Sequence, residues 1–271
     1  MCQNGAMPAI GGLRYLDAPP EGSGRPRGTL VLLHAFPLNA RMWEPQLPLS
    51  GGGWRVVAPH LRGADGAGGS PATSMDDHAG DVIDLLDALH IEDAVIGGLS
   101  MGGYVALALF RLAPRYFRGI VLADTRPQAD TAEGIEGRKR LLAVVHEKGP
   151  AAVADEMLPK LLGEDTRREQ PGTVERVREL VLSSSKSGIA AAITALMTRP
   201  DSTPVLPSIH CPTLILVGEQ DVVTPPAVSR DMQRAIPGSE LVVIPGAGHL
   251  SSLERPDAFN AALAPFLEHR V

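Results

Sequence analysis

The chain has 271 residues, 44% of them hydrophobic and 21% charged, and a formal net charge of −6. This size and composition indicate a globular protein with a substantial core, and the acidic balance argues against a nucleic-acid surface. The sequence contains no apolar run of membrane-spanning length, no secretory signal and only two cysteines, Cys2 and Cys211. We therefore expect a cytoplasmic protein without a disulfide framework, which binds neither nucleic acid nor membranes.

Short apolar runs alternate with segments of helical spacing along the first half of the chain. An apolar run bounded by turn-forming residues predicts a buried strand, and apolar residues three and four positions apart predict a helix. The predicted strands are 13–16, 29–33, 54–59, 94–96 and 119–123, the predicted helices are 42–47, 76–89 and 104–110, and a glycine-rich loop is expected over 62–74. This alternation predicts an α/β fold with a mostly parallel central sheet flanked by helices. No G-x-G-x-x-G pattern follows strand 29–33, which argues against dinucleotide binding.

The alternation stops between residues 126 and 207 and then resumes. Helices are predicted within this stretch at 134–147, 151–162, 174–182 and 189–198, and beyond it strands at 213–218 and 241–244 and helices at 226–236 and 256–269. Glycine and proline pairs separate the helices of the middle stretch. We expect a core built from residues 1–125 and 208–271, with residues 126–207 inserted as a helical cap over the carboxyl ends of the strands.

The segment Gly98-Leu99-Ser100-Met101-Gly102 stands between a predicted strand and a predicted helix. A G-x-S-x-G pattern in this context is typical of a nucleophile elbow, where a tight turn exposes the serine hydroxyl at the helix N-terminus. We expect Ser100 in a strained backbone conformation, and a side chain at position 98 or 102 to collide with neighbouring backbone. The alternative is an ordinary strand-to-helix turn in which the Ser100 side chain caps the helix.

A serine nucleophile needs a general base, and the base needs an orienting group. His249 follows the last predicted strand in a glycine-rich loop that lets the imidazole turn inward, so we predict that it is the base. His34 also follows a strand, and we expect it to hydrogen-bond its own loop. Asp221 is the predicted acid because it follows the neighbouring strand and because the order Ser, Asp, His fits a nucleophile elbow and its partners. Asp124, after strand 119–123, is the alternative acid.

The tetrahedral intermediate of acyl transfer needs two backbone N–H donors. Met101 directly follows the nucleophile and is predicted to supply one of them. Phe36, in the loop after strand 29–33, is predicted to supply the other, with Pro37 holding the turn. We expect the ring of Phe36 to face the acyl pocket.

Four segments together resemble the α/β-hydrolase superfamily along nearly the whole chain. They are LLHAFPL at 32–38, GGLSMGGY at 97–104, CPTLILVG at 211–218 and IPGAGH at 244–249. Within this superfamily, ADTR at 123–126 and RPDST at 199–203 are similar to bacterial carboxylesterases with a small helical cap, near the enol-lactonase and non-haem perhydrolase branches. The resemblance implies an α/β-hydrolase fold and a Ser-His-Asp carboxylic ester hydrolase that needs neither metal nor cofactor. Ala35 departs from the Gly of most relatives, and we expect its methyl group to narrow the oxyanion loop slightly.

The sequence therefore predicts a serine carboxylesterase for short- to medium-chain esters of small, largely apolar acids, and its expected partner is a small-molecule ester. A lactone or enol-lactone hydrolase and a perhydrolase would use the same residues and are the nearest alternatives. A non-catalytic receptor on this fold is disfavoured because Ser100, Asp221 and His249 are all present. A dehalogenase is disfavoured because it would need a carboxylate at position 100.

Overall fold

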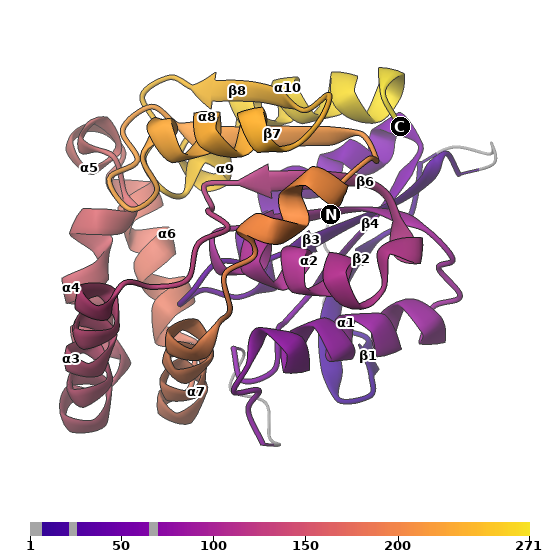
Figure 1. Ribbon diagram of the computed structural model, residues 1–271. Coiled ribbons are helices and arrows are strands. Elements are labelled where there is room, and N and C mark those ends of the chain that lie inside the picture. The colour runs from indigo at the N-terminus through magenta and orange to yellow at the C-terminus, as the bar shows by residue number, and fades with distance from the viewer. Residues whose placement is uncertain (1–6, 22–25, 65–69) are drawn as a thin grey trace.

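A mixed, mostly parallel sheet forms the centre of the structure, a computed structural model that describes residues 7–21, 26–64 and 70–271 (Figure 1). The strands described lie in the order β1 (Ala9–Ile10), β2 (Leu13–Ala18), β4 (Trp54–Pro59), β3 (Gly28–Leu33), β5 (Ala94–Leu99), β6 (Phe117–Ala123), β7 (Thr213–Gly218) and β8 (Glu240–Ile244). The β1–β2 and β2–β4 pairs are antiparallel and the other pairs are parallel. The predicted sheet is confirmed. The unpredicted β1 has only two residues, too few for a periodic pattern.

The inner parallel strands are buried on both faces, which is why they appear in the sequence as unbroken apolar runs, whereas the edge strand β8 is half-buried. In β3, for example, Leu30–Leu33 are at most 1% exposed. Helix α2 (Met101–Leu112) packs on β3, β5 and β6 and is covered by α1 (Met75–Ala88), while α8 (Pro226–Ala235) packs on β7 and β8. In Figure 1 these helices lie in front of the sheet, and α10 (Pro256–His269) lies behind it. Helix α10 packs against the 3₁₀ segment η1 (Ala40–Gly52) and the short α9 (Ser251–Glu254).

Three helices differ from the predicted ones for identifiable reasons. The predicted helix 42–47 is the longer 3₁₀ segment η1, which contains Pro45 and Pro48; proline removes the amide that an α-helical bond needs. Helix α2 begins at Met101 rather than 104, directly after Ser100. Helix α6 (Pro171–Leu182) begins before 174, because a proline predicted to break the chain is tolerated in the first helical turn.

Five helices between β6 and β7 form what we term the helical layer. They are α3 (Ala132–Lys148), α4 (Pro150–Leu161), α5 (Glu164–Glu169), α6 and α7 (Lys186–Thr198), followed by the 3₁₀ turn η3 (Thr203–Ser208). Helix α5 was not predicted because its six residues, EDTRRE, have no apolar periodicity. Figure 1 shows the layer at the left, beyond the carboxyl ends of the parallel strands.

A buried ionic cluster joins the two chain segments that connect the helical layer to the sheet. Asp130, whose side chain is 2% exposed, accepts hydrogen bonds from Arg126 (2.7 Å), Arg199 (2.9 Å) and Arg138 (3.2 Å). Burial raises the pKa of Asp130, but the bonds and charges of Arg199 and Arg138 outweigh burial and leave the pKa below its usual value. The Arg199 guanidinium also lies 4.2 Å from the ring centre of Tyr104 in α2. The carboxylate therefore fixes both ends of the layer to the sheet domain.

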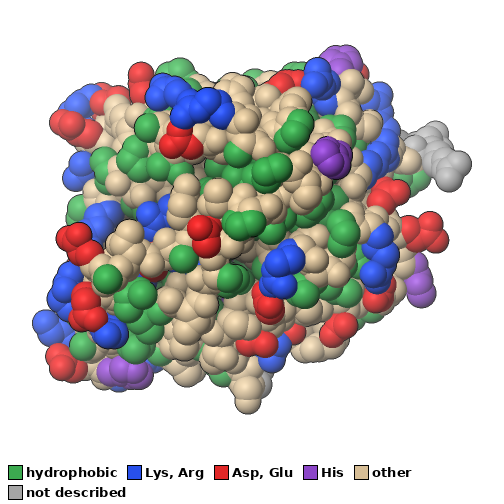
Figure 2. Space-filling view, in the orientation of Figure 1, with side chains coloured by type: hydrophobic (Ala, Val, Ile, Leu, Met, Phe, Trp, Pro, Cys, Tyr) green, Lys and Arg blue, Asp and Glu red, His purple; other side chains and the backbone are tan. Residues whose placement is uncertain are grey.

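Acidic and basic side chains are interspersed over the face shown in Figure 2, without a patch of one sign. Within the described part of the chain, no single helix is long and apolar enough to cross a membrane, although α6 and α7, bent by 94°, pass that test as a pair.

Candidate active site

The turn from β5 to α2 places Ser100 in a conformation that L-residues rarely adopt. Its φ and ψ are 54° and −110°, and its side chain caps no helical amide, so the alternative of an ordinary capping serine is wrong. A Cβ atom at Gly98 would lie 2.1 Å from the Gly102 carbonyl oxygen, and one at Gly102 would lie 2.0 Å from the Leu33 carbonyl oxygen. The predicted need for glycine at both positions is therefore visible in the backbone. Ser100 N–H donates to the Ala123 carbonyl at 2.9 Å, which ties the strained turn to β6.

His249 lies between Ser100 and Asp221. Its Nε2 is 2.8 Å from Ser100 Oγ, and its Nδ1 is 2.8 Å from Asp221 Oδ2. All three side chains are nearly buried, with Ser100 8%, Asp221 3% and His249 1% exposed. The backbone N–H of His249 donates to the carbonyl of Leu161 in α4, so the helical layer helps to hold the histidine loop.

Asp221 is held as an anion by its own loop. Its Oδ1 accepts from the amides of Val223 (2.7 Å) and Thr224 (2.9 Å), and its Oδ2 accepts from the Thr224 hydroxyl (2.6 Å). Burial raises the pKa of this carboxyl, but the charge and hydrogen bond of His249, together with the Thr224 bonds, outweigh burial and lower the pKa below its usual value. Thr224 was not predicted from the sequence. An aspartate side chain commonly accepts from the backbone amide two residues later, as Asp221 does from Val223, but nothing in the sequence marks the threonine hydroxyl as a further donor.

Asp124, the alternative acid, is fully buried and points elsewhere. Its Oδ1 accepts from Gly218 N–H at 2.8 Å, and its Oδ2 lies 2.5 Å from Ser251 Oγ. Burial and the nearby Asp221 carboxylate raise the pKa of Asp124 well above its usual value, against the opposing hydrogen bonds from Ser251 and Gly218. The pKa values of the two carboxyls are therefore shifted in opposite directions, and Asp221 is the one in contact with His249.

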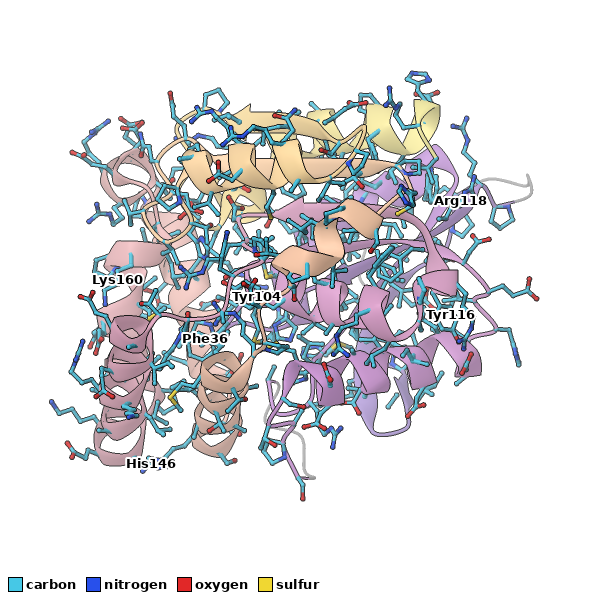
Figure 3. All side chains as sticks on the ribbon, viewed as in Figure 1. Phe36, Tyr104, Tyr116, Arg118, His146 and Lys160 are labelled. Carbon is cyan, nitrogen blue, oxygen red and sulfur yellow. The ribbon has the colours of Figure 1, made fainter. Side chains whose placement is uncertain are left out.

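The loop after β3 brings Phe36 to the same edge of the sheet. His34 fixes this loop as expected, with Nδ1 3.0 Å from the Ala35 carbonyl and Nε2 accepting from Leu61 N–H at 3.0 Å. Neither the amide of Phe36 nor that of Met101 donates to an acceptor within the described ranges. Both residues line one pocket, so two free N–H donors are available beside the nucleophile turn. Figure 3 shows Phe36 at the boundary between the sheet and the helical layer.

A small apolar pocket lies next to these amides. Its apolar walls come from the loops after β3 and β4 and from α7, including Leu38, Leu61, Ile189 and Ala192. The α7 residues were not identifiable from the sequence, because apolar residues at helical spacing indicate packing of any kind. Among the residues that the structure describes, no group of three or more His, Cys, Asp or Glu side chains is placed to hold a metal ion.

The sequence and the fold match known proteins over nearly the whole chain. Residues 28–256 match the family model of the α/β-hydrolase fold. The 3-oxoadipate enol-lactonase 2 of Acinetobacter baylyi is 30% identical over 239 residues, which cover 88% of this chain and 87% of the relative. The chain is an α/β hydrolase.

Two solved structures resemble this hydrolase over almost their full lengths. A thermophilic esterase from Thermogutta terrifontis, in a malate-bound structure, has a TM-score of 0.89 and 37% identity, covering 97% of this chain and 96% of the esterase. The enol-lactonase of Burkholderia xenovorans LB400 has a TM-score of 0.87 and 28% identity, covering 97% of this chain and all of that chain. The predicted family is confirmed, and the relatives named here are one esterase and two enol-lactonases.

Proposed function

We propose that this hydrolase is a serine carboxylesterase in which Ser100, His249 and Asp221 form the catalytic triad. The observation that carries the proposal is the continuous contact from Ser100 Oγ to His249 Nε2 and from Nδ1 to a carboxylate held in its charged form. A buried hydroxyl, imidazole and carboxylate in this order are the parts that acyl transfer requires.

In the acylation step, the Ser100 oxygen attacks the ester carbonyl while its proton moves to His249 Nε2. The carbonyl oxygen becomes an oxyanion, which the free amides of Phe36 and Met101 stabilise together with the N-terminal dipole of α2. When the intermediate collapses, the C–O bond to the alcohol breaks and the alcohol leaves with the proton from His249. Asp221 keeps the ring oriented with Nε2 toward the serine and stabilises the transient imidazolium.

In the deacylation step, water takes the place of the alcohol. His249 Nε2 accepts a proton from the water as the water oxygen attacks the acyl-enzyme carbonyl. When the second tetrahedral intermediate collapses, the C–O bond to Ser100 breaks, His249 Nε2 gives its proton to the serine oxygen, and the carboxylic acid leaves. No cofactor enters this cycle, since every proton and electron pair comes from the ester, the water and the triad.

Short- to medium-chain esters of small, largely apolar acids are the proposed substrates. The apolar walls contributed by Leu38, Leu61, Ile189 and Ala192 support this class. Residues 126–207 serve as the cap, because α7 supplies part of the wall and the last residue of α4, Leu161, accepts a hydrogen bond from the histidine loop. The flanking ranges 1–125 and 208–271 form the catalytic core.

A lactone hydrolase is the second candidate function. It is favoured by the A. baylyi relative, named a 3-oxoadipate enol-lactonase, and by the B. xenovorans enol-lactonase structure. A lactone is a cyclic ester, so the same triad would open it by the same two steps.

The test is a set of initial rates on 4-nitrophenyl esters from acetate to dodecanoate, with a lactone panel beside it and Ser100→Ala as the control. We expect turnover of the short and medium esters, and a loss of at least about 10³-fold in Ser100→Ala without loss of folding. The chain length at which rates fall reports the depth of the pocket. Ester turnover that survives in Ser100→Ala would contradict the proposed nucleophile, and turnover confined to lactones would favour the second candidate.

A further inference from the structure

His78 is a buried imidazole in the wall of the proposed acyl pocket. It lies in the first part of α1, is 1% exposed, and lines the pocket together with Phe36, Met101 and Ile189. Neither of its ring nitrogens has a hydrogen-bond partner within the described part of the chain. A buried polar group without a partner is costly, so the position calls for a ligand that supplies one.

The other polar side chains of this wall are already engaged. His34 bonds the backbone on both sides of its ring. Ser184 donates to the Ala64 carbonyl at 2.7 Å. The Arg62 guanidinium is paired with Asp81 through bonds of 2.9 and 2.5 Å. His78 is therefore the polar side chain in the described wall of this pocket that is left to recognise a bound molecule.

The environment favours a neutral ligand group. Burial, with a smaller contribution from Arg62, lowers the pKa of His78 to about 4, so the ring is uncharged near neutral pH. A neutral imidazole offers one N–H donor and one acceptor nitrogen. A carboxylate in the same place would be buried without a free cation, because Arg62 is already matched by Asp81.

We propose that His78 hydrogen-bonds a neutral oxygen atom on the acyl chain of the substrate, so that the enzyme prefers esters of hydroxy, alkoxy or keto acids to those of plain alkanoic acids. The proposal rests on the proposed function, because Phe36 and Met101, which would hold the carbonyl oxygen, border the pocket that contains His78. The chain attached to that carbonyl then extends toward the imidazole.

The experiment compares matched pairs of 4-nitrophenyl esters in which an oxygen replaces one methylene. The pairs are methoxyacetate with butanoate, 3-methoxypropanoate with pentanoate, and 4-methoxybutanoate with hexanoate. For each pair, the kcat/KM of the ether ester is divided by that of the alkyl ester. This ratio is then divided by the same ratio of rate constants for hydroxide-catalysed hydrolysis. The result, the corrected ratio, is free of the difference in intrinsic reactivity between the two esters. We expect at least one corrected ratio to be about 3- to 10-fold higher in the wild type than in His78→Phe, the range of one neutral hydrogen bond.

Two further variants identify the nitrogen and guard against a folding defect. In His78→Asn the side-chain amide lies near the place of Nδ1, and in His78→Gln it lies near the place of Nε2. One of the two variants is therefore expected to recover the preference for the ether ester. Ile189→Leu is the matched control, because it changes the same wall without changing polarity. It is expected to alter both members of a pair equally.

Equal corrected ratios in the wild type and His78→Phe would overturn the proposal while leaving the esterase proposal intact. Corrected wild-type ratios near one for all pairs would overturn it without any variant. A His78-dependent preference for the glutarate monoester over pentanoate would overturn the neutral class of ligand. Failure of the wild type to hydrolyse any of these esters would overturn the esterase proposal and this one with it.

Discussion

Asp124 and Ser251 are in direct contact, with Asp124 Oδ2 2.5 Å from Ser251 Oγ. Ser251 is two residues beyond His249, and the other oxygen of Asp124 accepts from Gly218, three residues before Asp221. The Asp124 carboxyl thus fixes the two loops that bring the imidazole and its acid together. The backbone of Asp124 has a φ of 43°, so this residue is also locally strained at the end of β6.

The two aspartates are expected to respond differently to the same substitution. Asp221→Asn removes the charge that orients His249 and stabilises its protonated form, and we expect kcat to fall by about 10²–10⁴-fold. Asp124→Asn replaces a carboxyl that does not contact the imidazole by an amide of the same shape, and we expect kcat within about fivefold of the wild type, because a hydrogen bond contributes about 1 kcal/mol. Steady-state kinetics on a 4-nitrophenyl ester measures both. The reverse order of the two variants would make Asp124 the acid.

The raised pKa of Asp124 also predicts how stability depends on pH. The pKa of Asp124 in the folded state lies well above its value in the unfolded state, so at pH values between the two the folded state binds more protons than the unfolded state. The contribution of Asp124 to the free energy of unfolding is therefore lost as the pH rises from the unfolded-state pKa through the folded-state pKa. The lowered pKa of Asp221 acts in the opposite sense, since its contribution is lost as pH falls through the folded value. Asp124→Asn should flatten the decline at higher pH, as measured by urea unfolding across a pH series. An unchanged profile would contradict a raised pKa of Asp124.

The candidate site could be predicted from the sequence because the proposed reacting groups follow short apolar strands of the sheet. Those strands are unbroken apolar runs, so their ends, and with them Ser100, Asp221 and His249, could be located before the structure was known. The contact of Asp221 rather than Asp124 with the imidazole was expected from the strand that each follows, and the geometry agrees.

The residues that line the pocket could not be predicted from the sequence in this way. Ile189 and Ala192 have the spacing of any packed helix face, and only tertiary packing decides that they line a cavity. His78 lies on an amphipathic helix, where the sequence cannot distinguish a bonded ring from one without partners. Of the predicted glycine-rich loop at 62–74, residues 65–69 lie outside the described residues.

The glycines of the nucleophile turn should tolerate no side chain. We expect Gly98→Ala and Gly102→Ala to lose about 1–3 kcal/mol or more of stability, and most esterase activity, because the added Cβ meets backbone rather than a movable side chain. Gly80→Ala in α1 is the matched control. A Cβ there has nothing within 4 Å, and we expect it to raise stability by about 0.5–1 kcal/mol. Urea unfolding and ester kinetics of the three variants make the comparison. Wild-type stability and activity in Gly102→Ala would contradict the close approach to Leu33.

The buried ionic cluster around Asp130 should contribute far more to the free energy of unfolding than the exposed ion pairs do. Asp130 and Arg199 side chains are each 2% exposed, so Arg199→Met removes one partner and leaves a charge buried with fewer donors. We expect a loss of about 3–5 kcal/mol in the free energy of unfolding, measured as a lower Tm and urea midpoint.

Activity should also fall at temperatures below the global unfolding transition, because the Asp130 cluster holds the helical layer, whose α7 supplies part of the pocket wall. Lys139→Ala, which breaks an exposed pair with Glu136, serves as the control and should cost about 0.5 kcal/mol or less. Equal losses in the two variants would mean that Asp130 does not fasten the layer to the sheet.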